Sequence, residues 1–186
     1  MTSRTITTRH MRTRKIMMTT LHHGFRAFVL GTLLVGALCQ MATATWAGGP
    51  YDALTVPPCR IVDTRLAGGP IPASGSRNFF AAGSFSSQGG QTTCGIPFGP
   101  AKGVFFNIVA VGPSASSHLT VYPYPLPLPL ASTLNFAAGQ TVANGVLVPI
   151  CDTAIDNCNA ADFTVTMGFA SADIVIDVTG YLQPTP

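Results

Sequence analysis

Short strand-like runs follow one another from Cys59 to the C-terminus, and clusters of Gly, Pro, Ser and Asn separate them at intervals of about ten residues. Some runs alternate apolar with polar residues, and the run 103–111 is apolar on both faces, as in a covered central strand. Period-two alternation is typical of a strand with one buried and one exposed face. Beyond the N-terminal segment, no stretch keeps the apolar repeat of an amphipathic helix. The sequence therefore predicts an all-β protein. We expect about eight strands, at residues 59–64, 78–82, 103–111, 118–124, 132–136, 141–150, 162–169 and 173–182.

These strands are expected to pack as a single β-sandwich of the jelly-roll-like kind, and a β-barrel is the alternative. The last strand shows how the core forms. Its even-numbered residues from Ile174 to Leu182 share one face, which we expect to be buried. Its odd-numbered residues from Asp173 to Tyr181 share the opposite face, which we expect to be partly exposed.

One segment, Tyr122–Leu130, alternates proline with tyrosine and leucine and contains four prolines. Proline lacks the N–H group that a strand ladder needs, so this segment cannot be a central strand. We expect an extended edge or a stiff crossing loop of polyproline character. A docking segment for a proline-reading partner is the alternative.

A secretory signal is predicted at the N-terminus. Basic residues precede an uncharged apolar run from Ala27 to Leu38, and small residues follow it. The run has about 12 residues, whereas a bilayer-spanning helix needs roughly 20, so it fits a signal peptide better than an uncleaved anchor. We expect cleavage after Ala47, with Ala44 as the alternative. Residues 1–47 would then be the signal peptide, 48–56 a flexible N-terminus, 57–183 the β-sandwich and 184–186 a C-terminal tail.

The distribution of charge excludes one class of partner. The chain has a formal net charge of +3, but six of its ten Lys and Arg residues precede position 27. All seven acidic residues are Asp and follow position 50, so the mature chain is acidic. A nucleic-acid-binding protein needs a basic patch for phosphate contacts, and the mature chain has too few cations to form one. We also expect no membrane attachment after the signal is cleaved.

Four cysteines follow the leader: Cys59, Cys94, Cys151 and Cys158. An even number in an exported chain predicts two disulfides and an oxidising compartment, so the protein should be secreted, at the cell surface or periplasmic. Of the three possible pairings we favour Cys151–Cys158, which closes a short polar loop, and Cys59–Cys94, which ties the first strand to a later loop. Zinc binding is the alternative, but the sequence offers no CxxC pair.

A series of motifs resembles a family of bacterial exported β-domains. In chain order they read PPCRIVDTR, CGIPFGPAKGVFFNIVAV, HLTVYP, LPLASTLNFAAGQTVANGVLVPI and DIVIDVTGYL, and together they cover about residues 57 to 182. The family pattern is PCR-x-x-DTR, then C-x-[IV]-P, then STLNF-x-x-GQ-x-x-AN, then DV-x-GY. The resemblance implies export, a β-sandwich-like domain and the Cys59–Cys94 pairing, and it implies no reaction.

An ion pair is predicted between the first and last strands. Asp177 stands among apolar residues, and a buried carboxylate is costly unless a cation or several donors meet it. We expect Arg65 to be that cation, because the planar fork of arginine fits a carboxylate. Asp63 lies on the same strand face as Arg65 and belongs to the same structural cluster. The alternative is that Asp63 and Arg65 bind a sugar or a carboxylate ligand.

Tyrosines supply a candidate ligand site. Carbohydrate-binding modules stack aromatic rings on sugars, and the single Trp46 lies in or beside the leader. Tyr122, Tyr124 and Tyr181 could form a smaller platform.

Acidic residues supply a weak calcium candidate at Asp152, Asp156 and Asp162, because closely spaced oxygen ligands can hold Ca²⁺. The spacing does not match an EF-hand loop, so we favour a solvated acidic loop with no metal.

The chain offers little for catalysis. It contains no Glu, and His118 lies in a predicted strand with no nucleophile elbow near it. There is also no phosphate-binding loop and no dinucleotide motif, so we expect no enzyme activity and no cofactor.

We predict a non-catalytic exported domain that acts by binding or assembly, with a cell-surface glycan or like subunits as partners. The alternatives are a carbohydrate-binding module, a subunit of an extracellular oligomer or fibre and a small secreted hydrolase.

Overall fold

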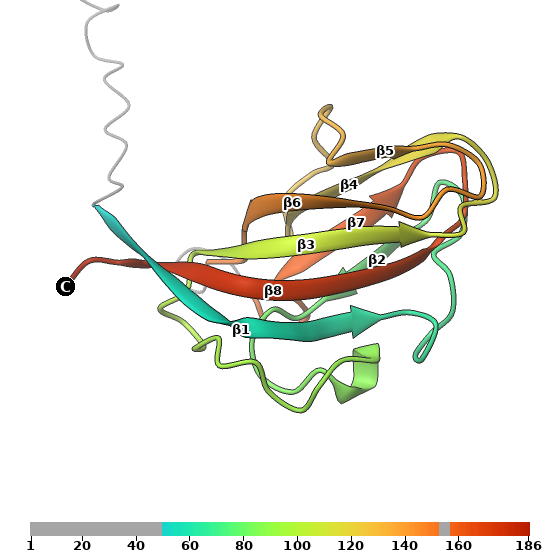
Figure 1. Ribbon diagram of the computed structural model, residues 1–186. Coiled ribbons are helices and arrows are strands. Elements are labelled where there is room, and N and C mark those ends of the chain that lie inside the picture. The colour runs from blue at the N-terminus through green and yellow to red at the C-terminus, as the bar shows by residue number, and fades with distance from the viewer. Residues whose placement is uncertain (1–49, 153–156) are drawn as a thin grey trace, which may run out of the picture. The chain divides into compact units, whose positions relative to one another are not determined.

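The computed structural model describes residues 50–152 and 157–186, so the predicted signal peptide and Asp156 lie outside the described residues. The described chain forms β-strands and a short 3-10 helix, and the all-β prediction is confirmed (Figure 1). The elements are β1 (Tyr51–Asp63), β2 (Ser76–Phe79), η2 (Ser86–Gln88), β3 (Gly103–Val111), β4 (Ser117–Pro123), β5 (Leu134–Phe136), β6 (Val142–Pro149), β7 (Phe163–Met167) and β8 (Asp173–Pro184).

The strands form two antiparallel four-stranded sheets, with orders β1-β8-β3-β6 and β2-β7-β4-β5. Strand β1 pairs with β8, β2 with β7, β3 with β6 and β4 with β5. The first and last strands therefore pair, and the pairing continues inward to the middle of the chain. This is jelly-roll topology, and it confirms the predicted sandwich. In the part of the chain that the structure describes, no helix is long and apolar enough to cross a membrane.

The core lies between the two sheets, where inward-facing residues alternate along each strand. Phe106 of β3 meets Phe163 of β7 with ring centroids 4.9 Å apart, and Phe79 of β2 packs on Phe163 at 5.7 Å. Ile108 and Ile176 are fully buried beside them. Each fully buried side chain of this size contributes roughly 1.5–3 kcal/mol relative to an exposed one, so this buried cluster stabilises the packing of the two sheets.

In strand β8 the buried and exposed side chains differ in part from the prediction. Ile174, Ile176 and Val178 are buried as expected, but Val175, predicted to lie on the partly exposed face, is also buried. The pairing with β3 then shifts, because Phe106 pairs with Val178 and Phe105 pairs with Gly180, so Thr179 is an extra residue. A bulge of one residue reverses the faces that follow it. Tyr181 therefore packs against the core, opposite to the prediction.

The N-terminal boundary also differs from the prediction. Residues 51–56, which we expected to be flexible, form the first part of β1 and pair with the end of β8 from Tyr51↔Pro184 onward. Pro184, predicted to lie in the tail, ends β8. At the other predicted boundary, β4 ends at Pro123, and no strand occurs from Tyr124 to Leu130. From Tyr124 to Leu130 the proline-rich segment is thus a connector, one of the two predicted forms, whereas Tyr122 and Pro123 belong to β4.

Candidate functional site

The predicted ion pair between the first and last strands exists, but with a different arginine. Arg60 of β1 lies directly opposite Asp177 of β8 in the strand register. Its Nε donates to Asp177 Oδ1 at 2.9 Å and its second terminal nitrogen donates to Oδ2 at 3.1 Å. The prediction that Arg65 binds Asp177 is wrong, because β1 ends at Asp63 and Arg65 lies in the turn beyond it.

Arg65 instead binds Asp63, whose side chain is only 2% exposed. It donates from Nε to Oδ1 at 2.8 Å and from a terminal nitrogen to Oδ2 at 2.6 Å, and Arg60 reaches the same Oδ2 at 3.3 Å. These hydrogen bonds from Arg65 hold the pKa of the Asp63 carboxyl below its usual range, although burial opposes them. Asp63, Arg65 and Asp177 therefore belong to one network, with Arg60 between its two carboxylates.

Thr64 completes this junction. Its backbone N–H donates to Ile174 O at 3.0 Å, and its hydroxyl donates to Asp173 Oδ1 at 2.7 Å while accepting from Ile174 N at 2.9 Å. The CRIVDTR and DIVID motifs thus hold the two ends of the domain together. The charged groups of these motifs are already paired with one another. This favours a structural role for Asp63 and Arg65 over the binding of a sugar or a carboxylate ligand.

Both predicted disulfides are present, Cys59–Cys94 and Cys151–Cys158, with Cα–Cα distances of 5.6 Å in each. The first holds a strap, residues 86–95, along the outer edge of β1 (Figure 1). In this strap Gln91 N donates to Arg60 O at 2.9 Å, and Gly89 has a φ of 80°. A Cβ on Gly89 would lie 2.1 Å from Asp63 O, so the strap can approach β1 this closely only with glycine there.

The three predicted tyrosines do not form one platform. Tyr122 lies on β4 in the second sheet, where its hydroxyl is 3.0 Å from Thr166 Oγ1 on β7. Tyr181 lies on β8 in the first sheet and packs toward the core. Tyr124 follows β4 at the start of the proline-rich connector. The structure therefore places Tyr122 and Tyr181 on different sheets and Tyr124 outside both, which does not favour sugar stacking on one platform.

The calcium candidates are also separated. Asp162 is buried and accepts hydrogen bonds from the Ala81 and Ala82 N–H groups at 2.7 and 3.2 Å. Asp152 forms an ion pair with Lys102, and Asp156 lies outside the described residues. Over residues 50–152 and 157–186, no group of three metal-binding side chains comes together.

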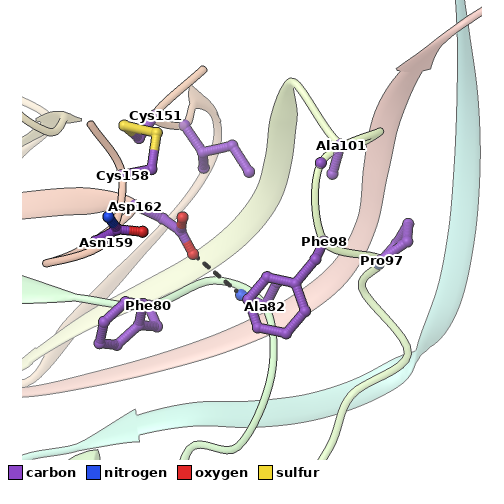
Figure 2. Close-up of a pocket in the computed structure, with 11 residues that line it drawn as sticks. Phe80, Ala82, Pro97, Phe98, Ala101, Cys151, Cys158, Asn159 and Asp162 are labelled. Atoms are coloured by element: carbon purple, nitrogen blue, oxygen red, sulfur yellow. Dashed lines mark hydrogen bonds between the residues drawn. A yellow bond between two sulfur atoms is a disulfide. The ribbon is translucent and has the colours of Figure 1, made fainter. Parts of the chain in front are cut away.

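Asp162 lies at a pocket of ≈ 240 Å³. Figure 2 shows its side chain between Phe80 and the Cys151–Cys158 disulfide, with a hydrogen bond to Ala82 and the Phe98 ring beyond. Ile150 adds a further apolar wall. Burial raises the pKa of Asp162, and the two backbone N–H bonds act in the opposite direction with a smaller effect. The sequence signalled this residue as a calcium ligand but not as the polar group of an apolar pocket.

A second candidate site is the edge formed by β6. From Gly103 to Cys151 the chain contains no Asp, Glu, Lys or Arg, a run that includes β3, β4, β5 and β6. Strand β6 has eight residues, of which Val148 alone is buried. Ala143 and the 46% exposed Leu147 point to the outer face of the sheet. Apart from the ladder to β3, no described backbone hydrogen bond reaches residues 142–149.

The other three sheet edges are short or covered. The strap covers β1, β2 has four residues and β5 has three. Natural proteins protect long edges with charge, proline, bulges or covering loops, and β6 has no charged residue, proline or bulge before its final Pro149. The end of the connector reaches β6 through the Asn144 side chain, and no described backbone bond covers the edge itself. The register between β6 and β3 runs without a shift from Val142 to Pro149. Among the described strands, β6 is thus the long unprotected edge.

The proline-rich connector adds exposed apolar side chains on the same side of the sandwich. Leu126, Leu128 and Leu130 are all exposed, and Leu130 is fully so. Asn144 of β6 donates to Thr133 O at 2.8 Å, which places the end of the connector beside β6. In Figure 1 the connector projects from the body next to β5. The uncharged run from Gly103 to Cys151 therefore carries both the β6 edge and the exposed leucines.

No protein-family model, curated protein or solved structure matches the chain. The structure itself defines the class as a jelly-roll sandwich with two disulfides. The disulfides indicate an oxidising, non-cytoplasmic compartment.

Proposed function

We propose that the protein is a non-catalytic exported domain, secreted or held at the cell surface, that assembles with a second copy of itself through the edge of β6. The observation that carries this proposal is the eight-residue β6 edge, which lies in a run of sequence without charged residues and has no described backbone partner on its outer side. The two disulfides support an exported location. The resemblance to exported β-domains supports it as well.

A second copy fits this edge for three reasons. Two β6 strands can pair antiparallel about a two-fold axis, which is the closed arrangement that most homodimers use. Such pairing continues the antiparallel pattern of the sheet, so the β1-β8-β3-β6 sheet of one copy would join that of the other. The absence of charged side chains from Gly103 to Cys151 removes like-charge repulsion between identical surfaces.

The test is the double substitution Ala143→Lys with Leu147→Lys, which adds four lysines across a two-fold interface. Both side chains lie on the outer face of β6, so the fold should tolerate them. We expect size-exclusion chromatography with light scattering to show a dimer for the wild type. The variant should have a dissociation constant at least about tenfold higher, because like charges on facing strands repel.

The matched control is Leu66→Lys with Phe169→Lys, at positions that are 76% and 84% exposed and outside β6. This control should keep the dimer. A wild type that stays monomeric at about 1 mM would refute assembly through β6, because a useful homodimer binds more tightly than that. Loss of the dimer in the control variant as well would also refute it. A monomer that binds specific glycans on an array would support the carbohydrate-binding alternative.

A further inference from the structure

Two aspartates in the described chain are buried, and they differ in how their charge is met. Asp63 lies between two guanidinium groups. Asp162, which is 8% exposed, has only the N–H groups of Ala81 and Ala82, and both bind the same oxygen, Oδ2. A carboxylate in an apolar site is costly unless a cation or several donors meet it. Asp162 is therefore a buried acid to which no described side chain supplies a cation.

The second oxygen of Asp162 is accessible from the pocket. No hydrogen bond in the described structure reaches Oδ1, yet every buried side-chain nitrogen and oxygen there has a partner. Oδ1 must therefore contact open space, and Asp162 lines the pocket shown in Figure 2. The N–H groups of Ala81 and Ala82 hold the carboxylate in place, so this oxygen has a fixed position.

The lining of the pocket is largely apolar, and Asn159 is its other polar side chain. Phe80, Phe98, Ile150 and the Cys151–Cys158 disulfide line the pocket, and Asp162 is the one described lining residue with an ionisable side chain. Lys102 and Asp152 follow the lining residues Ala101 and Cys151, but they pair with each other. The volume of ≈ 240 Å³ is below the roughly 300–1,000 Å³ that is usual for drug-sized ligands. The pocket thus suits a small ligand with one positive end.

We propose that this pocket binds a primary ammonium group carried on a short apolar stem, as in an alkylamine or the side chain of a lysine. The ammonium would donate a charge-assisted hydrogen bond to Asp162 Oδ1. The stem would pack against Phe80 and Phe98, whose ring faces also attract a cation. This site is separate from the β6 edge and does not depend on assembly of the protein.

The test is a titration of the ¹⁵N-labelled mature protein with n-butylammonium, with 1-butanol as the neutral probe of similar size. Saturable shifts should appear at the backbone amides of Ala81, Ala82 and Ile150. Asp162→Asn keeps an acceptor for the two N–H groups but removes the charge, so it should weaken n-butylammonium binding about tenfold or more. Ala143→Lys with Leu147→Lys should leave binding unchanged, which separates this site from the assembly surface.

Two further measurements keep the proposal testable if Asp162→Asn does not fold. Phe98→Ala removes a ring that is 68% exposed, so it should weaken binding without unfolding the domain. Repeating the wild-type titration at a pH low enough to protonate Asp162 should abolish the preference for the ammonium. Equal affinity for 1-butanol would overturn the proposal, as would unchanged binding in folded Asp162→Asn or the absence of any saturable shift.

Discussion

Replacing Asp63 by Asn tests whether the buried carboxylate at the junction of the first and last strands stabilises the domain. The substitution keeps the size of the side chain but removes the charge that two arginines meet at 2.6 and 3.3 Å. Removing one partner of a buried ion pair costs 3–5 kcal/mol. Because Arg60 and Arg65 are 38% and 47% exposed, water will solvate them in part, and we expect the lower end, about 3 kcal/mol at neutral pH.

The loss should depend on pH in a defined direction. The arginines lower the pKa of Asp63 in the folded state, so its contribution is fully present above the unfolded value of about 3.9. It is lost as the pH falls through the lowered folded value. The difference in unfolding free energy between wild type and Asp63→Asn should therefore be largest at neutral pH and should shrink in acid.

Urea denaturation followed by circular dichroism, at pH 7 and at about pH 3, measures both effects. At neutral pH the melting temperature should fall by about 10 °C for a domain of this size. Asp52→Asn is the matched control, because Asp52 accepts a hydrogen bond from the Thr185 hydroxyl and contacts no cation in the described structure. Equal stability of wild type and Asp63→Asn at pH 7 would refute the reasoning. A deficit of the same size at both pH values would refute it too.

Two more predictions concern this junction and the strap that covers β1. In double-mutant cycles of unfolding free energy, Asp177→Asn should couple with Arg60→Ala by about 1 kcal/mol, because Arg60 contacts Asp177. The same substitution should be additive with Arg65→Ala, because Arg65 binds Asp63. The reverse result would support the Arg65–Asp177 pair that the sequence predicted. Gly139→Ala should cost about 1–2 kcal/mol, because φ is 70° but the space is open, whereas Gly89→Ala should cost clearly more because its Cβ would meet Asp63 O. Similar losses in urea denaturation would show that the strap moves away from β1 freely.

Local patterns in the sequence were sufficient to predict the strands. Each structural strand overlaps a predicted run, because alternation and turn residues act over short distances. The cysteine pairs could also be predicted, one from its short loop and the other from its place in the first strand. The proline-rich connector was evident because proline cannot donate in a ladder.

The errors arose where one strand meets another. Which arginine faces Asp177 depends on the register between β1 and β8, and shifts in that register lie between Thr55 and Cys59 and between Arg60 and Val62. The extra residue Thr179 reverses the faces at the end of β8. No local pattern encodes these shifts, because each one reflects how two distant segments fit together.

The candidate sites were partly visible in the sequence. The uncharged run from Gly103 to Cys151 can be read directly, but its meaning depends on β6 lying at an edge, which is a property of strand order. The acidic loop indicated Asp162 as a calcium ligand, but not as a buried carboxylate at a pocket. Its burial follows from contacts with Ala81 and Ala82, about eighty positions away in the chain.

The two ends of the described domain lie next to each other, since Tyr51 pairs with Pro184 and Thr185 N donates to Pro50 O at 3.0 Å. A domain with adjacent ends can be inserted into a surface loop of a host protein without forcing the host's chain apart. For the same reason, a short linker could join Pro186 to Pro50, and new termini could be opened in the exposed connector at Leu128. The jelly roll would then be a portable module whose uncharged edge could be displayed on any scaffold with a suitable loop.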